Sequence, residues 1–98
     1  MGGRLMTDTR RKWTFLTNHG HVLVYVHRNS DARVRDIATA VGITERAAQT
    51  ILADLENDGY LRKTKVGRRN TYAVNTKGQF RHPEEAGHRI GDLLSLFQ

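Results

Sequence analysis

Seven lysines and arginines lie between residues 59 and 83, a stretch that contains no aspartate or glutamate. They are Arg62, Lys63, Lys65, Arg68, Arg69, Lys77 and Arg81. Their summed charge exceeds the net charge of the whole 98-residue chain, which is +6. A basic surface gathered in one segment is typical of proteins that bind a polyanion, most often nucleic acid. Because the segment also contains strand-forming residues and a turn signal, we expect a structured basic hairpin rather than a charged tail.

The composition excludes several kinds of chemistry. The chain has no cysteine, so it has neither a disulfide scaffold nor a thiolate nucleophile or metal ligand. It also has no Gly-rich phosphate loop and no paired Ser/His/Asp pattern, and we therefore expect neither an enzyme nor a cofactor. A length of 98 residues allows one small domain.

No segment of the sequence has the pattern of a membrane span or an export signal. The longest apolar run, Val22 to Val26, is too short to cross a bilayer. The basic residues before Trp13 are not followed by the apolar stretch of a signal peptide. We therefore expect the protein in the cytoplasm, associated with the nucleoid.

Three helices are predicted between a polar N-terminal arm and the basic segment. The arm, residues 1–12, is expected to be disordered. The predicted helices run from Thr17 or Asn18 to about Arg28, from Arg35 to Val41, and from Thr44 to about Asp58. In the third, Thr44 is a typical N-cap and Glu45 suits the first turn. A short extended segment, residues 32–34, is expected before the second helix.

The second and third helices have the spacing of a helix-turn-helix. Ala38 is small where two helices would cross, and Gly42 permits a tight turn because it has no Cβ. Ala48 and Ile51 would then dock the third helix onto the second. These constraints within one segment, residues 34–55, favour a helix-turn-helix over an ordinary helical hairpin.

The basic segment itself is predicted to form a hairpin. Its strands are Tyr60 to Val66 and Thr71 to Val74, and the four residues from Gly67 to Asn70 form the turn. Pro83 then stands where a last helix can begin, and the apolar spacing predicts that helix from Glu84 to Phe97.

The order helix, short strand, helix-turn-helix, basic hairpin and helix resembles the winged helix-turn-helix of bacterial and archaeal transcription regulators. The chain is similar to both the MarR-like and the ArsR-like groups. The resemblance rests on Arg35-Asp36-Ile37-Ala38, Val41-Gly42-Ile43-Thr44, Leu52-Ala53-Asp54-Leu55-Glu56, Gly59-Tyr60-Leu61 and Gly67-Arg68-Arg69-Asn70. It implies an α+β fold, mainly helical, with a small antiparallel β-hairpin wing. The DNA-binding domain would span residues 13–82, and a C-terminal dimerisation helix would span residues 83–98.

The resemblance implies a sequence-specific, double-stranded DNA-binding transcription regulator, with the helix over residues 44–58 in the major groove. The outward positions near its start are Thr44, Glu45, Arg46, Gln49 and Thr50. Arg46 can donate a bidentate pair to guanine, and Gln49 can form one with adenine. Glu45 can accept from a cytosine amino group.

The wing, residues 61–74, would supply the electrostatic part of binding. Arg68 and Arg69 at its tip would reach phosphates or the minor groove, with Asn70 assisting. The remaining predicted phosphate contacts are Lys63 and Lys65 on the wing and Arg33 and Arg35 before the second helix.

A homodimer is expected, because one copy of such a motif contacts about one half-site. The predicted dimer surface combines the last helix with apolar residues near the N-terminus. It comprises Ile90, Leu93, Leu94, Leu96 and Phe97 together with Trp13, Phe15 and Leu16.

Two alternatives remain open from the sequence. One is an ArsR-like metal-responsive repressor that uses C-terminal ligands, with Glu84, His88 and Asp92 on one helix face. His82 and Glu85 lie close to them in the sequence. The other is a winged-helix module that binds proteins instead of DNA.

Overall fold

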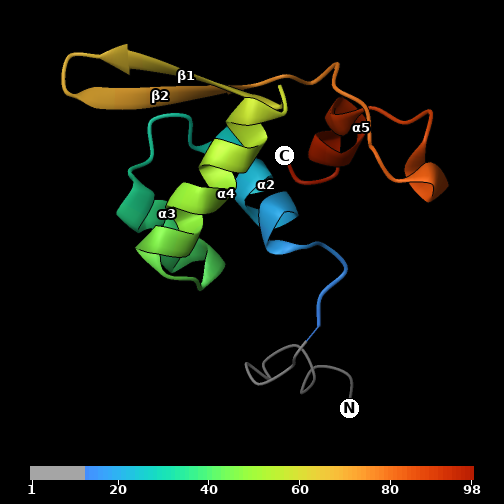
Figure 1. Ribbon diagram of the computed structural model, residues 1–98, viewed down its shortest axis with the longest axis horizontal. Coiled ribbons are helices and arrows are strands. Elements are labelled where there is room, and N and C mark those ends of the chain that lie inside the picture. Colours follow the sequence, from blue (N-terminus) through green and yellow to red (C-terminus); the bar gives the residue numbers. More distant parts are fainter. Residues whose placement is uncertain (1–12) are drawn as a thin grey trace.

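The structure, a computed structural model, describes residues 13–98 and contains four α-helices and one β-hairpin (Figure 1). The predicted arm, residues 1–12, lies outside the described residues. The elements in chain order are α2 (Asn18–Arg28), α3 (Val34–Val41), α4 (Glu45–Asn57), β1 (Leu61–Val66), β2 (Arg69–Val74), the 3₁₀ turn η1 (Pro83–Glu85) and α5 (Ile90–Ser95). None of the helices in residues 13–98 combines the length and the apolar character that a membrane span requires.

The first three helices begin and end where the local sequence directs. The Thr17 hydroxyl accepts a hydrogen bond from the Gly20 amide at 3.2 Å and caps α2. The Thr44 hydroxyl accepts one from the Ala47 amide at 3.0 Å and caps α4. Gly42 ends α3 with φ at +85°, a left-handed conformation that side chains other than glycine rarely adopt. The predicted helix-turn-helix is therefore confirmed.

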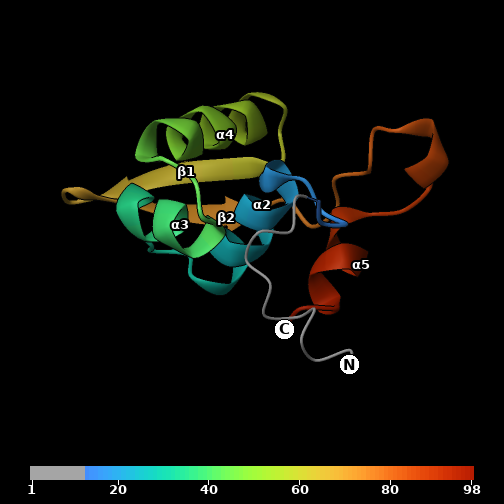
Figure 2. The same cartoon turned by 90° about the horizontal axis from the view of Figure 1, so that it is seen from below.

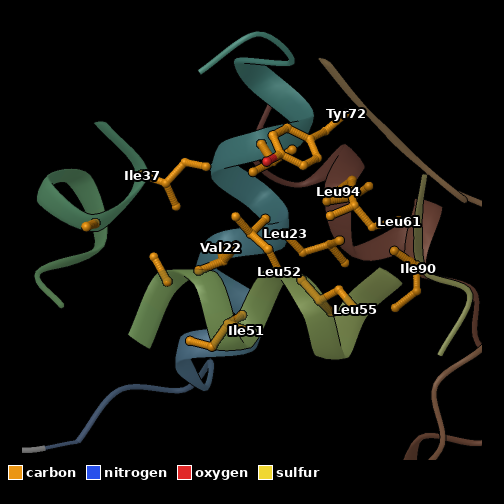
Figure 3. Packing of buried hydrophobic residues seen from close by; sticks show 13 residues of the cluster. Val22, Leu23, Ile37, Ile51, Leu52, Leu55, Leu61, Tyr72, Ile90 and Leu94 are labelled. Carbon is orange, nitrogen blue, oxygen red and sulfur yellow. The ribbon is translucent and has the colours of Figure 1, made fainter. Parts of the chain in front are cut away.

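The hydrophobic core lies where these helices meet the base of the hairpin (Figure 3). The buried residues are Val22, Leu23, Val26, Ile37, Ala38, Ala48, Ile51, Leu52, Leu55, Leu61, Tyr72, Ile90 and Leu94. The apolar spacing predicts five inward residues on α4, namely Ala47, Ala48, Ile51, Leu52 and Leu55; the last four are buried and Ala47 is half-buried. This packing leaves the opposite face of α4 toward solvent.

The hairpin differs from the prediction in its turn. Val66 pairs with Arg69, so that the turn consists of only Gly67 and Arg68. Gly67 has φ at +65°, which a tight two-residue turn requires. The predicted four-residue turn is wrong because Arg69 and Asn70 already belong to β2 and pair with β1.

The predicted short strand at residues 32–34 is also not present. Val34 is the first residue of α3, because the Asp36 carboxylate accepts a hydrogen bond from the Arg33 amide at 3.3 Å. The loop before α3 makes a single backbone hydrogen bond to the hairpin, from the Tyr72 amide to the Ser30 carbonyl at 2.8 Å.

The C-terminal region is not one helix from Glu84 to Phe97. Ala86 is extended and Gly87 has φ at +88°, and α5 has only six residues. The backbone around Arg89 bonds instead to the segment that follows the wing. Ile90 donates to the Gly78 carbonyl at 2.7 Å, and Gly91 donates to the Thr76 carbonyl at 2.9 Å. These bonds take up amides that a longer helix would use internally.

The short helix α5 and the helix α3 lie at opposite ends of the molecule (Figure 2). Ile90 and Leu94 of α5 are buried in the core of the same chain. Those two residues were predicted to form part of a dimer surface, and that prediction is wrong, since α5 uses them to cover the base of the hairpin.

Candidate nucleic-acid interface

The first two turns of α4 present a polar face to solvent. Glu45, Arg46, Gln49 and Thr50 are all exposed. In the part of the chain that the structure describes, none of these four side chains has a hydrogen-bond or ion-pair partner. Behind them, Ala48 and Ile51 fix the helix against α2 and α3. The predicted base-reading residues therefore lie together, on a rigid element, with their polar groups available.

Thr44 differs from its neighbours because its side chain already makes a hydrogen bond within the protein. Its oxygen is the N-cap acceptor for the Ala47 amide. A hydroxyl that accepts this bond still has a proton to donate. The Thr44 hydroxyl can therefore cap α4 and also donate a hydrogen bond at the exposed face.

The last two turns of α4 and the C-cap Asp58 have a different electrostatic character. Each of their three carboxylates lies near a cationic or protonatable group from another element. The pairs are Asp54 with His19 at 2.8 Å, Glu56 with Lys63 at 4.0 Å, and Asp58 with Arg81 at 2.8 Å. Apart from Glu45 in the first turn, the carboxylates of α4 and its C-cap therefore lie at the end away from the polar face.

The wing divides its basic residues between two faces. Lys63 lies opposite Tyr72 and Lys65 lies opposite Asn70, on the face that is turned toward the helices. Arg62 lies opposite Ala73 on the other face, is exposed, and has no ion-pair partner among the described residues. Arg62 was not among the predicted site residues, although its position in the alternating strand pattern distinguishes it from Lys63.

The two adjacent arginines of the wing are in different environments. Arg68 is in the exposed turn, and its side chain makes no hydrogen bond within residues 13–98. The Arg69 guanidinium turns back along the wing and donates to the Asp31 carbonyl at 2.8 Å. The expectation that both arginines lie at the tip is therefore wrong for Arg69, because the two-residue turn places it in the strand.

A basic groove forms between the wing and the start of α3. Its volume is about 300 Å³, and it brings Arg33 together with Arg68, Arg69 and Asn70. Arg35 and the exposed residues of α4 do not line it. Beneath the groove, burial raises the pKa of the Tyr72 hydroxyl, and a hydrogen bond with the Asn70 side chain acts in the opposite direction.

The structure contradicts the helix face on which the metal-site alternative depended. Glu84 is in η1, His88 is in the following extended segment, and Asp92 is in α5, where it accepts from the Arg89 amide at 3.3 Å. Among residues 13–98, no group of three or more histidine, aspartate or glutamate side chains is arranged to hold a metal ion.

A protein-family model matches a segment that covers both the helix-turn-helix and most of the wing. The model of the FaeA-like protein family matches residues 18–72, more than half of the chain. The chain belongs to the FaeA-like protein family. This is a family of winged helix-turn-helix proteins, in agreement with the element order described above. A comparison with curated protein sequences gives no match.

Solved structures of MepR, a transcription regulator of the Staphylococcus aureus multidrug efflux pump MepA, have a similar fold. One has 25% sequence identity and a TM-score of 0.53, and the match covers 61% of this chain and 47% of that one. A MepR mutant from a multidrug-resistant clinical isolate of S. aureus has 21% identity and a TM-score of 0.58, with 83% of this chain and 53% of that one covered.

A second MepR mutant from such an isolate has 17% identity and a TM-score of 0.58, with 98% of this chain and 81% of that one covered. The chain spans about half the length of the first two structures. These similarities confirm the predicted α+β winged helix-turn-helix fold.

Proposed function

We propose that this protein is a sequence-specific double-stranded DNA-binding transcription regulator. The observation that carries the proposal is the exposed polar face of α4, which has no carboxylate except Glu45 and lies in the same fold as the basic groove of the wing. The FaeA-like family and the similarity to the regulator MepR support this function. The likeness to MepR favours the MarR-like of the two predicted groups.

In the proposed complex, α4 enters the major groove with its N-terminal turns first. Arg46 would read guanine and Gln49 would read adenine, since both side chains can form two parallel hydrogen bonds to a base edge. Glu45 and Thr50 would contact neighbouring bases. The positive end of the helix dipole favours approach to the phosphates at this end of α4.

The wing and the start of α3 would bind the sugar-phosphate backbone. Arg68 would reach a phosphate or the minor groove, and Asn70 would assist it. Arg33, Arg35 and Lys65 would contact phosphates, and Lys63 would do so in competition with Glu56. Such contacts position a protein on DNA and make its affinity dependent on salt.

We further propose a homodimer, with a surface that differs from the one expected from the sequence. Since Ile90 and Leu94 are buried, the exposed residues of the predicted dimer surface are Phe15 at 93%, Leu96 at 74%, and Trp13 and Phe97. Trp13 and Phe15 pack edge to face, with their ring centroids 5.3 Å apart. Phe15 and Phe97 line one hollow of about 600 Å³ beside α2 and the end of α3. An apolar surface of this kind is suited to a second copy of the chain.

Selection of bound duplexes from a random DNA pool tests the proposed function. We expect enrichment of a site with two related half-sites whose centres lie about 10 base pairs, or one helical turn, apart. A pool without enrichment would contradict sequence-specific binding and favour the protein-interaction module. Light scattering at micromolar concentration tests the dimer separately, and a monodisperse monomer would contradict it.

A further inference from the structure

The outer part of the wing has no hydrophobic anchor. Every residue of β1 after Leu61 is exposed, and Val66 has 62% of its surface accessible. On β2 the buried residue is Tyr72, three positions after Arg69. Apolar packing therefore holds the base of the wing but ends at Tyr72. The segment beyond it, residues 64–71, needs another interaction to keep a fixed direction.

That interaction is a hydrogen bond from Arg69 to the loop between α2 and α3. The Arg69 guanidinium donates to the Asp31 carbonyl at 2.8 Å. Among residues 13–98, it is the only side-chain hydrogen bond that joins segment 64–71 to the rest of the chain outside the hairpin. One residue before Asp31 in the sequence, the Ser30 carbonyl accepts from the Tyr72 amide at 2.8 Å.

The bond connects the wing to the unit that contains α4. Asp31 lies two residues before Arg33, the N-cap of α3, and α3 packs directly on α4. A guanidinium is planar and always charged, so its bond to a carbonyl is both directional and charge-assisted. Arg33, Arg68 and Arg69 line one small groove, together with a single carboxylate, Asp31. Without the bond, no side-chain hydrogen bond among residues 13–98 would hold segment 64–71 against the loop between α2 and α3, and the wing would be free to move away from α3.

We propose that Arg69 is a positioning residue that fixes the wing against the helix-turn-helix, while Arg68 in the turn makes the contact with DNA. The DNA part of this inference, the contact made by Arg68, rests on the proposed function. The geometric part, the fixing of the wing by Arg69, does not. Two adjacent arginines, which the sequence presents as equivalent, would therefore have separate roles.

The geometric part can be tested on the free protein. The chain has no cysteine, so Thr39→Cys on α3 and Thr64→Cys on β1 provide two unique, exposed sites for spin labels. Distances between the labels report the direction of the wing relative to α3. We expect a narrow distance distribution for the labelled parent and a broad one after Arg69→Ala. We expect no broadening after Arg68→Ala, the matched control.

A second control identifies the acceptor. Asp31→Asn removes the carboxylate but retains the backbone carbonyl, so the distribution should stay narrow. An Arg69→Ala distribution as narrow as that of the parent would overturn the proposal. So would a broadening by Asp31→Asn equal to that by Arg69→Ala, since the carbonyl would then not be the anchor.

The DNA part is tested by affinity as a function of salt, on a duplex from the random-pool selection. Arg68→Ala should reduce the slope of log affinity against log salt by about 0.9, the value for one phosphate contact. Arg69→Ala should weaken binding about three- to tenfold at every salt concentration, the effect of ordering one flexible segment on binding, with an unchanged slope.

The outcomes separate this inference from the proposed function. A slope that falls equally for both variants, or an affinity that Arg69→Ala leaves unchanged, would overturn the positioning role. If the parent bound no duplex at all, the proposed function would fail, and the spin-label distances would still decide whether Arg69 holds the wing.

Discussion

The exposed faces of the two halves of α4 differ in what surrounds their charged side chains. In the first half, the charged side chains Glu45 and Arg46 have no partner within the described residues. In the second half, each carboxylate is close to a cationic or protonatable group on α2, β1 or the C-terminal segment. Carboxylates repel phosphates, and the first half has one carboxylate whereas the second half and its C-cap have three, so the N-terminal end of the helix favours approach to DNA. The other elements of the fold thus influence how charge is distributed along α4, in addition to the sequence of the helix itself.

Substitution of Arg46 should give the largest effect on the proposed binding. Arg46→Ala removes the side chain best suited to bind a guanine. The difference in binding free energy between the selected duplex and a duplex with that base pair changed should fall by about 1–3 kcal/mol. Competition between the selected duplex and duplexes with one changed base pair measures this loss. Asp54→Asn, on the other half of α4, is the matched control and should leave discrimination unchanged. An equal loss of affinity for cognate and random DNA after Arg46→Ala would exclude base reading by this residue.

The start of α4 should be sensitive to loss of its cap. Thr44→Ala removes the acceptor for the Ala47 amide and should lower the free energy of unfolding by about 1 kcal/mol. Urea denaturation measures the change. Thr44→Ser retains the hydroxyl, so it should lower the free energy of unfolding much less. If the serine variant were as unstable as the alanine variant, the cap would not be what stabilises this end of the helix.

At the other end of α4, the ion pair between Asp58 and Arg81 should contribute little. Both side chains are largely exposed, and exposed pairs contribute about 0.2–1 kcal/mol. A double-mutant cycle with Asp58→Asn and Arg81→Gln should give a coupling energy in this range at low salt. The coupling should decrease at high salt because ions screen it. A coupling that did not respond to salt would indicate a contact other than the ion pair.

The smallest effect is expected from Glu56, which lies 4.0 Å from Lys63. Glu56→Gln releases Lys63 for phosphate binding and should improve DNA affinity by about a few tenths of a kcal/mol. Fluorescence anisotropy titration measures this gain. Glu84→Gln removes the same charge from the 3₁₀ turn, at a distance from the proposed interface. If both variants gained equally, the change in net charge would explain the result without Lys63.

The helix-turn-helix could be predicted because its signals are local. The cap at Thr44 lies within three residues of the amide that it binds, and Gly42 allows the left-handed turn by its own conformation. The apolar spacing of α4 then identified its buried face correctly. Local signals of this kind are sufficient where neighbouring residues in the sequence also determine the structure.

The wing turn and the C-terminal helix were predicted less well, since distant contacts determine them. The position of Tyr72 in the core fixes which residues pair in the hairpin, and this pairing moves Arg69 from the turn into the strand. Backbone bonds to Gly78 and Thr76 compete with helix formation near Ile90. The bond from Arg69 to Asp31 joins residues 38 positions apart, and no spacing pattern in the sequence indicates it.

The way in which the C-terminal segment is attached has a practical consequence for protein engineering. Its bonds to residues 76–80 are between backbone groups, and none of them involves a backbone group of residues 81–87. Residues 81–89 are all exposed and lie at the end of the molecule remote from α3 (Figure 2). A short peptide tag inserted between Ala86 and Gly87 would therefore lengthen a surface loop without touching the core or the wing. The fold thus offers an internal attachment point for a reporter group that leaves the exposed polar face of α4 unobstructed.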